Sequence, residues 1–212
     1  MKNEDVIKES EMLSTRNNLY PIFLKVRDLE VLIVGGGNVA LEKLSFLLKS
    51  SPNAKVTMIS PMFREATAKL ANSYGVTLLL KQYKKRYLKG KHIVIATTDK
   101  PEVNTSIYRH CRKRSILVNV ADNPPYCDFY MGGIVTKGNV KVAISTNGQS
   151  PTTAKRLRQF FEEVLPENVD DLVQNLNEYR KTIQGDFEQK VEILNEFTKG
   201  LIGKKEVKND QN

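Results

Sequence analysis

The chain has 212 residues, a hydrophobic content of 40% and a net charge of +9, so it is long enough for one α/β domain with a sizeable core plus a smaller region. No stretch approaches the ~20 apolar residues of a transmembrane helix and the N-terminus lacks an apolar signal-peptide region, which predicts a soluble, cytoplasmic protein with no membrane partner. The positive charge favours an anionic partner, and composition alone leaves a dinucleotide, a polycarboxylate and nucleic acid open.

A short apolar run at residues 31–34 ends in three glycines and is followed by helical periodicity. Gly35, Gly37 and Ala40 match the G-x-G-x-x-G/A pattern: the first residue permits a tight turn, the second lets backbone approach a pyrophosphate, and the third keeps the helix close to the strand. The helix start would present unpaired N–H groups and a positive dipole end to phosphate. The pattern predicts a dinucleotide site, and a purely structural tight turn remains the alternative.

The predicted elements alternate between strands and helices and then change character. Strands are expected at residues 30–34, 55–59, 76–80, 92–96 and 116–120, and helices at residues 38–49, 62–73 and 101–114. A hairpin of residues 129–135 and 140–145 around the turn 136–139 follows, and then amphipathic helices at residues 152–165, 169–184 and 187–201. This order predicts an α/β fold: a Rossmann-type parallel sheet, a β-hairpin region and a C-terminal helical domain.

The second predicted strand ends in Ser60 and lacks the Asp or Glu that usually binds the adenosine ribose at this position. The Ser60 hydroxyl is able to bond the ribose directly. Arg64, a turn further on, equally suits a 2′-phosphate or an ordinary solvated helix surface. The spacing therefore leaves the choice between NAD and NADP open.

Polar residues also follow the fourth and fifth predicted strands, whose carboxyl ends would face the cofactor crevice. Thr97, Thr98 and Asp99 follow the fourth strand, and Asp99 is expected to cap the next helix, near Pro101, or to contact the cofactor, two roles that are compatible. Asp122 follows the fifth strand. It is either a proton-transferring carboxylate beside a nicotinamide ring or a turn-forming residue, and local sequence does not separate the two.

The first C-terminal helix is expected to have Ser150 as its N-cap. Lys155, Arg156 and Arg158 lie just inside its start, either as a row of cations for substrate carboxylates or as a solvated face. Elsewhere, Cys111 and Cys127 are too isolated for a disulfide framework or a thiolate metal site, and the two histidines have no metal-ligand spacing. We therefore expect free thiols and no metal site.

Five segments together resemble the precorrin-2 dehydrogenase family of sirohaem biosynthesis, which includes the N-terminal dehydrogenase and ferrochelatase part of sirohaem synthase. The segments are YPIFL (20–24), VGGGNVA (34–40), ATTD (96–99), VNVAD (118–122) and STNGQSP (145–151). The resemblance implies NAD-dependent oxidation of precorrin-2 to sirohydrochlorin by a homodimer. The reduced tetrapyrrole gives a hydride to the nicotinamide and a proton to a base.

The resemblance also assigns roles. Asp122 matches the catalytic aspartate, and Ser150 matches a serine of the substrate cleft that is phosphorylated in some relatives. Matches at Asn38, Val39 and residues 60–62 favour NAD. With the residues identified above, the expected cofactor site comprises Gly35, Gly37, Asn38, Val39, Ser60, Pro61, Met62, Thr97, Thr98 and Asp99. The expected substrate site comprises Asn147, Ser150, Lys155, Arg156 and Arg158.

The expected domain organisation follows the same division. It consists of a mobile tail (1–18), an NAD-binding Rossmann domain (19–126), a dimerisation hairpin region (127–149), a helical domain (150–203) and a charged tail (204–212). Some members of the family also insert ferrous iron into sirohydrochlorin, and the sequence leaves this second activity open. The alternative from another class is an NAD(H)-sensing Rossmann module without catalysis. The basic run at residues 81–91 is expected to be a solvated loop, with no nucleic acid as partner.

Overall fold

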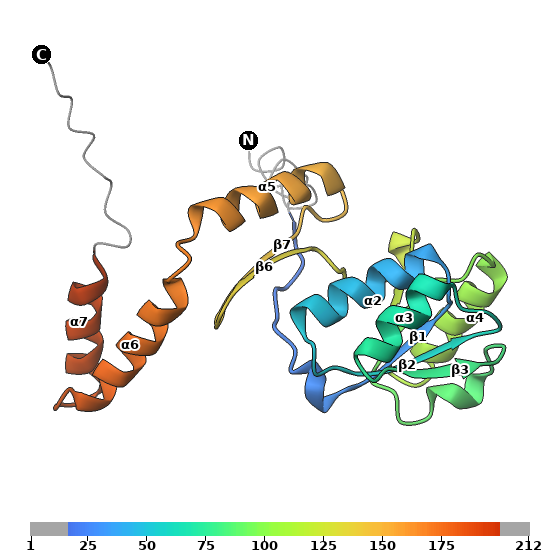
Figure 1. The fold of residues 1–212 in the computed structure, drawn as a ribbon, viewed down its shortest axis with the longest axis horizontal. Helices are drawn as coiled ribbons and strands as arrows, with labels where there is room; N and C mark the ends of the chain where they lie inside the picture. The colour runs from blue at the N-terminus through green and yellow to red at the C-terminus, as the bar shows by residue number, and fades with distance from the viewer. Residues whose placement is uncertain (1–16, 200–212) are drawn as a thin grey trace, which may run out of the picture. The chain divides into compact units, whose positions relative to one another are not determined.

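The computed structural model describes residues 17–199, which form two compact units (Figure 1). The first unit contains residues 17–134 and Ala143–Arg158, and the second contains Val135–Val142 and residues 159–199. The tail predicted at residues 204–212, most of the tail predicted at residues 1–18, and the predicted helix end at Leu201 lie outside the described residues.

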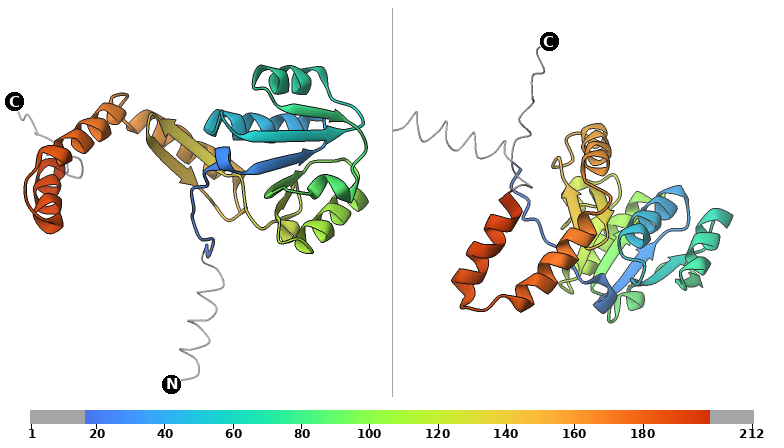
Figure 2. Two further views of the ribbon diagram at one scale, coloured as in Figure 1. Left: turned by 90° about the horizontal axis from the view of Figure 1, so that it is seen from below. Right: turned by 60° about the vertical axis from the view of Figure 1, so that its left-hand side comes forward.

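The first unit is built on a five-stranded parallel sheet with the strand order β3-β2-β1-β4-β5. The strands are β1 (Glu30–Val34), β2 (Lys55–Ser60), β3 (Thr77–Leu80), β4 (Ile93–Ala96) and β5 (Leu117–Val120). The helices between them are α2 (Asn38–Ser50), α3 (Glu65–Ser73) and α4 (Pro101–Arg112), with the single turns η1 (Val26–Asp28), η2 (Lys85–Leu88) and η3 (Pro124–Tyr126). Helices α2 and α3 cover one face of the sheet, and α4 covers the other (Figure 2).

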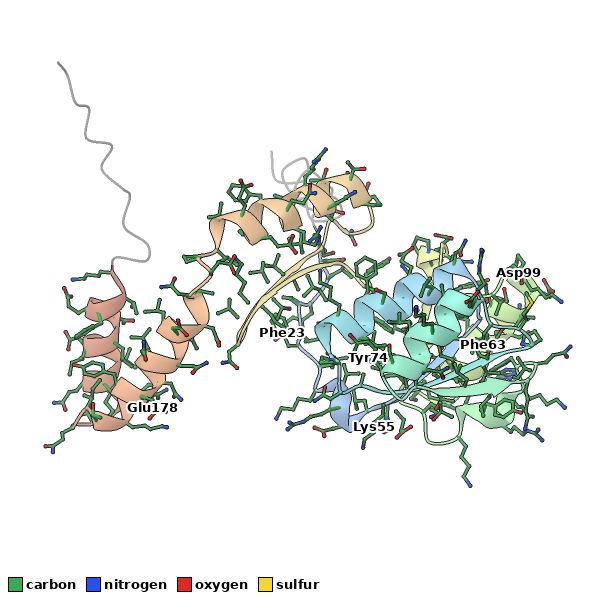
Figure 3. All side chains as sticks on the ribbon, in the orientation of Figure 1. Phe23, Lys55, Phe63, Tyr74, Asp99 and Glu178 are labelled. Carbon is green, nitrogen blue, oxygen red and sulfur yellow. The ribbon has the colours of Figure 1, made fainter. Side chains whose placement is uncertain are left out.

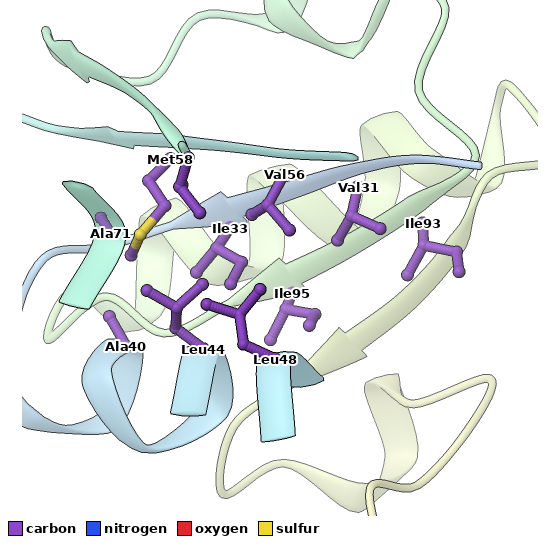
Figure 4. Packing of buried hydrophobic residues seen from close by; sticks show 11 residues of the cluster. Val31, Ile33, Ala40, Leu44, Leu48, Val56, Met58, Ala71, Ile93 and Ile95 are labelled. Carbon is purple, nitrogen blue, oxygen red and sulfur yellow. The ribbon is translucent and has the colours of Figure 1, made fainter. Parts of the chain in front are cut away.

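The central strand β1 is buried on both faces, as a parallel strand between helical layers should be. Val31 and Ile33 pack with Leu44 and Leu48 of α2 on one face (Figure 4), whereas Leu32 and its neighbours pack with α4 on the other. The buried residues of α2, Ala40, Leu44 and Leu48, recur at the spacing of one helix face, in agreement with the helical periodicity of this segment.

Two elements begin three or more residues later than the sequence predicts. Helix α3 starts at Glu65, three residues after the predicted start, because the chain before it folds over the glycine turn: the N–H of Arg64 donates to the carbonyl of Gly36 at 3.0 Å. Strand β6 (Gly133–Lys137) starts four residues late because Phe129 and Met131 pack against the core of the sheet.

The second unit contains most of the hairpin β6–β7, where β7 is Val140–Ile144, together with the end of α5 (Pro151–Val164), α6 (Val169–Thr182) and α7 (Phe187–Thr198). Asp170 at the start of α6 accepts hydrogen bonds from the backbone N–H and side-chain amide of Asn139, at 2.6 and 2.8 Å, and so fastens the hairpin turn. A capping box of Asp186 and Gln189 starts α7. Within residues 17–199, no helix is long and apolar enough to cross a membrane. The predicted fold class is confirmed.

Candidate active site

The strand register places the carboxyl ends of the strands along one edge. Val34 pairs with both Ile59 and Ala96, and Ala96 pairs with Val120, so the segments that follow these strands start side by side. The chain order reverses between β1 and β4, which is the switch point where open α/β sheets bind ligands. We call this edge the rim; Asp99 lies on it, and Lys55 marks the opposite end of the sheet (Figure 3).

Gly35 occupies a position that only glycine suits. Its φ of 132° lies outside the range that residues with a side chain normally adopt. A Cβ here would collide with Oγ1 of Thr97 and come within 2.8 Å of the Thr97 carbonyl oxygen. Thr97 in turn donates to the carbonyl of Val34 at 2.9 Å. The turn after β1 and the end of β4 are therefore in direct contact.

The other side of the glycine turn is held by α3 and the segment before it. A Cβ on Gly36 would collide with the carbonyl oxygen of Met62. The hydroxyl of Thr67, a fully buried residue of α3, donates to the carbonyl of Gly37 at 3.4 Å. Sequence reasoning missed Thr67, although a threonine on the buried stripe of a helix was a usable signal.

Gly37 leaves the start of α2 open for a ligand. It is the N-cap of this helix and makes no side-chain cap bond, and no acidic residue lies in the first turn. A Cβ at Gly37 would meet no atom within 4 Å. The N–H groups of Asn38 and Val39, in the first turn of α2, have no intrahelical acceptor and can donate to an anion such as a pyrophosphate, without a competing carboxylate in this turn. The residues present fit a dinucleotide.

The end of β2 contributes a hydroxyl. Ser60 is buried, and its Oγ accepts from the N–H of Met62 at 3.4 Å. Pro61, Met62 and Arg64 are exposed beside it. This geometry does not separate NAD from NADP, so the alternative left open by the sequence stays open.

The turn after β4 is held by hydrogen bonds to Asn104, a residue that the sequence analysis did not identify. Asn104 of α4 accepts from the Thr98 hydroxyl at 2.7 Å and donates to the Thr98 carbonyl at 2.9 Å. The alternative in which Asp99 caps α4 is wrong: Pro101 is the first helical residue, the N-cap is Lys100, and the Thr98 hydroxyl accepts from the Lys100 N–H. Asp99 is exposed on the rim.

Asp122 lies on the same rim in an unusual backbone conformation. The N–H of Ala121 donates to the carbonyl of Ala96 at 2.9 Å, which joins β5 to β4 at this edge. Asn123 closes a turn onto the carbonyl of Val120 at 3.2 Å, and Asp122 has a φ of 57° within it. Its exposed carboxylate makes no hydrogen bond or ion pair with any other residue among 17–199. The backbone of Asp122 therefore forms the turn while its side chain stays available for chemistry.

The predicted substrate residues lie in the same compact unit as the rim. Ser150 caps α5 as predicted, since its hydroxyl accepts from the N–H of Thr153 at 3.2 Å. Asn147 has a φ of 53° in the turn before it. Lys155 and Arg156 are exposed and Arg158 is half-buried along the start of the helix.

The two cysteines are free, as the sequence predicts. Burial raises the pKa of Cys111 to about 12 and also raises the pKa of Cys127, so both are neutral thiols at pH 7. Within residues 17–199, no group of three or more His, Cys, Asp or Glu side chains is arranged to hold a metal ion. Burial lowers the pKa of His110, which bonds to the hydroxyl of Tyr83 at 3.2 Å.

The sheet order and the glycine turn at its switch point define a Rossmann-type dinucleotide-binding protein. The family described as "Putative NAD(P)-binding" matches residues 22–133, more than half of the chain, and the chain belongs to this family. A second family, "Sirohaem biosynthesis protein central", matches residues 137–163.

The relatives agree with the resemblance stated from the motifs. The chain is 36% identical over 167 residues to a protein named siroheme synthase from Pseudoalteromonas translucida, with 79% of this chain and 35% of the relative covered. It is 37% identical over 164 residues to the siroheme synthase of Methylococcus capsulatus, with 77% and 34% covered. The chain thus spans about a third of the length of these curated relatives. A solved structure described as SirC, precorrin-2 dehydrogenase, shares the fold, with a TM-score of 0.69, 23% identity, and 84% of this chain and 89% of that chain covered.

Proposed function

We propose that this chain oxidises precorrin-2 to sirohydrochlorin with NAD as the hydride acceptor. The observation that carries the proposal is Asp122, an exposed carboxylate without a partner among residues 17–199, on the same rim as the glycine turn. A sensor module would need the glycine turn alone. A proton acceptor beside it is what a dehydrogenase needs.

Different residues of the chain bind the cofactor and accept the proton. Gly37, Asn38 and Val39 hold the pyrophosphate through backbone N–H groups, and Thr97 to Asp99 border the crevice on its other side. Bound NAD supplies the acceptor for the hydride. The Asp122 carboxylate accepts the proton that the reduced tetrapyrrole loses, so one hydride and one proton leave the substrate together.

The choice of NAD rests on the resemblance at residues 38–39 and 60–62. Ser60 supports it by placing a hydroxyl at the end of β2, where the ribose is bound in this fold. The exposed guanidinium of Arg64 supports the competing NADP interpretation. Rates measured with each cofactor in turn decide between them.

The substrate is a polycarboxylate, and the start of α5 offers cations to it. Lys155, Arg156 and Arg158, with Asn147 and the capped Ser150, form the proposed substrate site. The net charge of +9 supports binding of such a polyanion. A cytoplasmic location belongs to the same proposal, because NAD-linked biosynthesis takes place there.

We further propose a homodimer that uses the hairpin region, with the domain boundaries given above. Exposed aromatic residues in the second unit support this, since Phe160, Phe187 and Phe197 are 53%, 68% and 66% exposed. Tyr20 and Phe23, in the first unit, are exposed as well. Light scattering coupled to size exclusion tests this, and a monomer at micromolar concentration would contradict it.

The experiment that tests the function is anaerobic incubation of the protein with precorrin-2 and NAD, followed by absorbance. Formation of sirohydrochlorin with reduced cofactor is expected. If the protein binds NAD but converts no precorrin-2 with either NAD or NADP, the result would favour the NAD(H)-sensing module. A second incubation with sirohydrochlorin and ferrous ion as substrates measures the iron insertion that the sequence leaves open.

A further inference from the structure

The loop that carries Asp122, residues 121–129, returns to the strand that it leaves, and we call it the return loop. The N–H of Asp128 donates to the carbonyl of Val118 at 2.8 Å, and the N–H of Val118 donates to Oδ2 of Asp128 at 3.0 Å. Nearer the turn, the N–H of Val120 donates to Sγ of Cys127 at 3.4 Å, and the thiol donates to the Val120 carbonyl at 3.2 Å. The loop is thus closed at its base by Cys127 and Asp128.

The Cys127 thiol also reaches across the loop. Its sulfur lies 3.3 Å from the carbonyl oxygen of Asn123, the residue after Asp122, and 3.5 Å from the side-chain nitrogen of Asn119. The same Asn119 nitrogen donates to the carbonyl of Phe129 at 2.8 Å. A thiol is both a weak donor and a weak acceptor, and burial keeps this one protonated at neutral pH.

Helix α4 supports the other side of the return loop. Arg112 donates to Oδ1 of Asp128 at 2.9 Å, so the two carboxylate oxygens of Asp128 bridge α4 and β5. The ring of Tyr126 stacks on Tyr108 of α4 with a centroid distance of 4.4 Å. The loop base therefore has polar and aromatic anchors on two elements.

These anchors matter because no group within residues 17–199 bonds to the Asp122 carboxylate itself. The side chain of Asp122 has no hydrogen-bond partner among residues 17–199, so its position on the rim follows from the backbone of the loop. That backbone is in the left-handed region at Asp122, a strained conformation for a residue with a side chain, which persists only where the surrounding structure enforces it.

We propose that Cys127 and Asp128 are positioning residues for Asp122, which they act on by closing the return loop against β5. The inference rests on the proposed role of Asp122 as proton acceptor and goes beyond it by naming what places that acceptor. A base displaced by about 1 Å loses on the order of 100-fold in rate.

The test compares two variants, each of which lacks one of the two thiols. Cys127→Ala opens the loop base, whereas Cys111→Ala removes a buried thiol of α4 that packs in the core of the first unit. We expect Cys127→Ala to lower kcat about tenfold or more, with the dissociation constant of NAD unchanged, since a loss of this size is a partial misplacement. Cys127→Ser retains a donor and an acceptor and should recover most of the rate. Asp128→Ala should act in the same direction as Cys127→Ala. Cys111→Ala should lower stability and leave kcat unchanged.

A double substitution separates positioning from general weakening of the fold. If Cys127 acts through Asp122, then adding Cys127→Ala to Asp122→Asn causes little further loss of kcat. The same full loss in both backgrounds would overturn the inference, because the thiol would then act independently of Asp122.

The outcomes also separate this inference from the proposed function. Turnover by the wild-type chain with equal kcat in the Cys127→Ala and Cys111→Ala variants would overturn the positioning role alone. Absence of turnover in the wild-type chain with either cofactor would overturn the proposed function and, with it, the role of Asp122 on which the inference rests.

Discussion

The sheet of the first unit and the helices of the second differ in how they bury apolar side chains. Residues 31–34 of β1 and Leu44 of α2 are at most 2% exposed, enclosed on both faces of the sheet. In α6, α7 and the end of α5, no residue is fully buried, and Ile183, in the connection between α6 and α7, is 9% exposed. The difference teaches that the first unit encloses a core of its own, whereas the second leaves large apolar side chains of its helices exposed.

The largest expected effect tests whether the chemistry belongs to the sheet unit. Asp122→Asn removes the proton acceptor without changing the shape of the turn, so kcat should fall on the order of 10²–10⁴-fold while NAD affinity is retained. Initial rates from absorbance and a cofactor titration measure the two quantities. Asp28→Asn, an exposed carboxylate of η1, is the matched control and should keep the wild-type rate. A normal rate in Asp122→Asn would remove its assigned role.

The next prediction compares burial in the two units by truncating one apolar side chain to alanine in each. Leu44→Ala opens a cavity in the core and should lower the free energy of unfolding by about 2–5 kcal/mol at any protein concentration. Val173, on α6 of the second unit, is 39% exposed. Val173→Ala should cost less, and its cost should depend on protein concentration if a second copy covers this helix. Urea unfolding at two protein concentrations measures both losses of unfolding free energy. Equal losses that do not depend on protein concentration would contradict the difference in burial between the two units.

A smaller effect separates structural from ligand-binding glycines inside the first unit. Gly35→Ala meets both the φ of 132° and the Thr97 carbonyl, so it should destabilise the fold by about 1–3 kcal/mol or more. Gly37 has a φ of –86° and open space around it. Gly37→Ala should fold normally and weaken NAD binding about tenfold, or about 1.4 kcal/mol, because its methyl group enters the space for the pyrophosphate. Thermal unfolding and cofactor titration distinguish the pair; unimpaired binding by Gly37→Ala would contradict the placement.

The smallest expected effect concerns the ion pair between Lys91 and Glu30, at the end of the sheet opposite the rim. The hydrogen bond from Lys91 to Glu30, at 2.9 Å, holds the pKa of this carboxyl below its ordinary value. The contribution to stability is present above the ordinary pKa of about 4.3 and is lost as the pH falls through the lowered pKa. Because the Glu30 side chain is 40% exposed, we expect at most about 1 kcal/mol. Unfolding curves of wild type and Glu30→Gln from pH 7 to pH 3 should converge; a constant difference would refute the ion pair.

Much of the sheet was predictable because the signals are local. Short apolar runs, helical periodicity in α2 and the three glycines place the strands, the first helix and the turn close to their observed bounds. The predicted starts of helix α3 and strand β6 are too early. The residues just before each observed start contact distant parts of the chain instead of joining the helix or the strand. Phe129 and Met131 have strand-like hydrophobicity, yet they pack against the sheet of the first unit.

The candidate site was predictable in its residues more than in its contacts. Thr97 and Asp122 were identified because polar residues follow apolar strands, but the sequence does not show which of them have partners. The roles of Thr67, Asn104 and Cys127 depend on hydrogen bonds to residues elsewhere in the sequence. No pattern within a window of neighbouring residues contains that information.

The sequence by itself determined the order of strands and helices, the glycine turn and the polar residues at strand ends, because side-chain periodicity and backbone preference act over a few residues. Only the tertiary structure decided that Ala96 aligns with Val34 and Val120, that Lys100 and not Asp99 caps α4, and that the Asp122 side chain stays unpartnered within residues 17–199. These features depend on strand register and on hydrogen bonds between distant segments, which exist only once the sheet has formed.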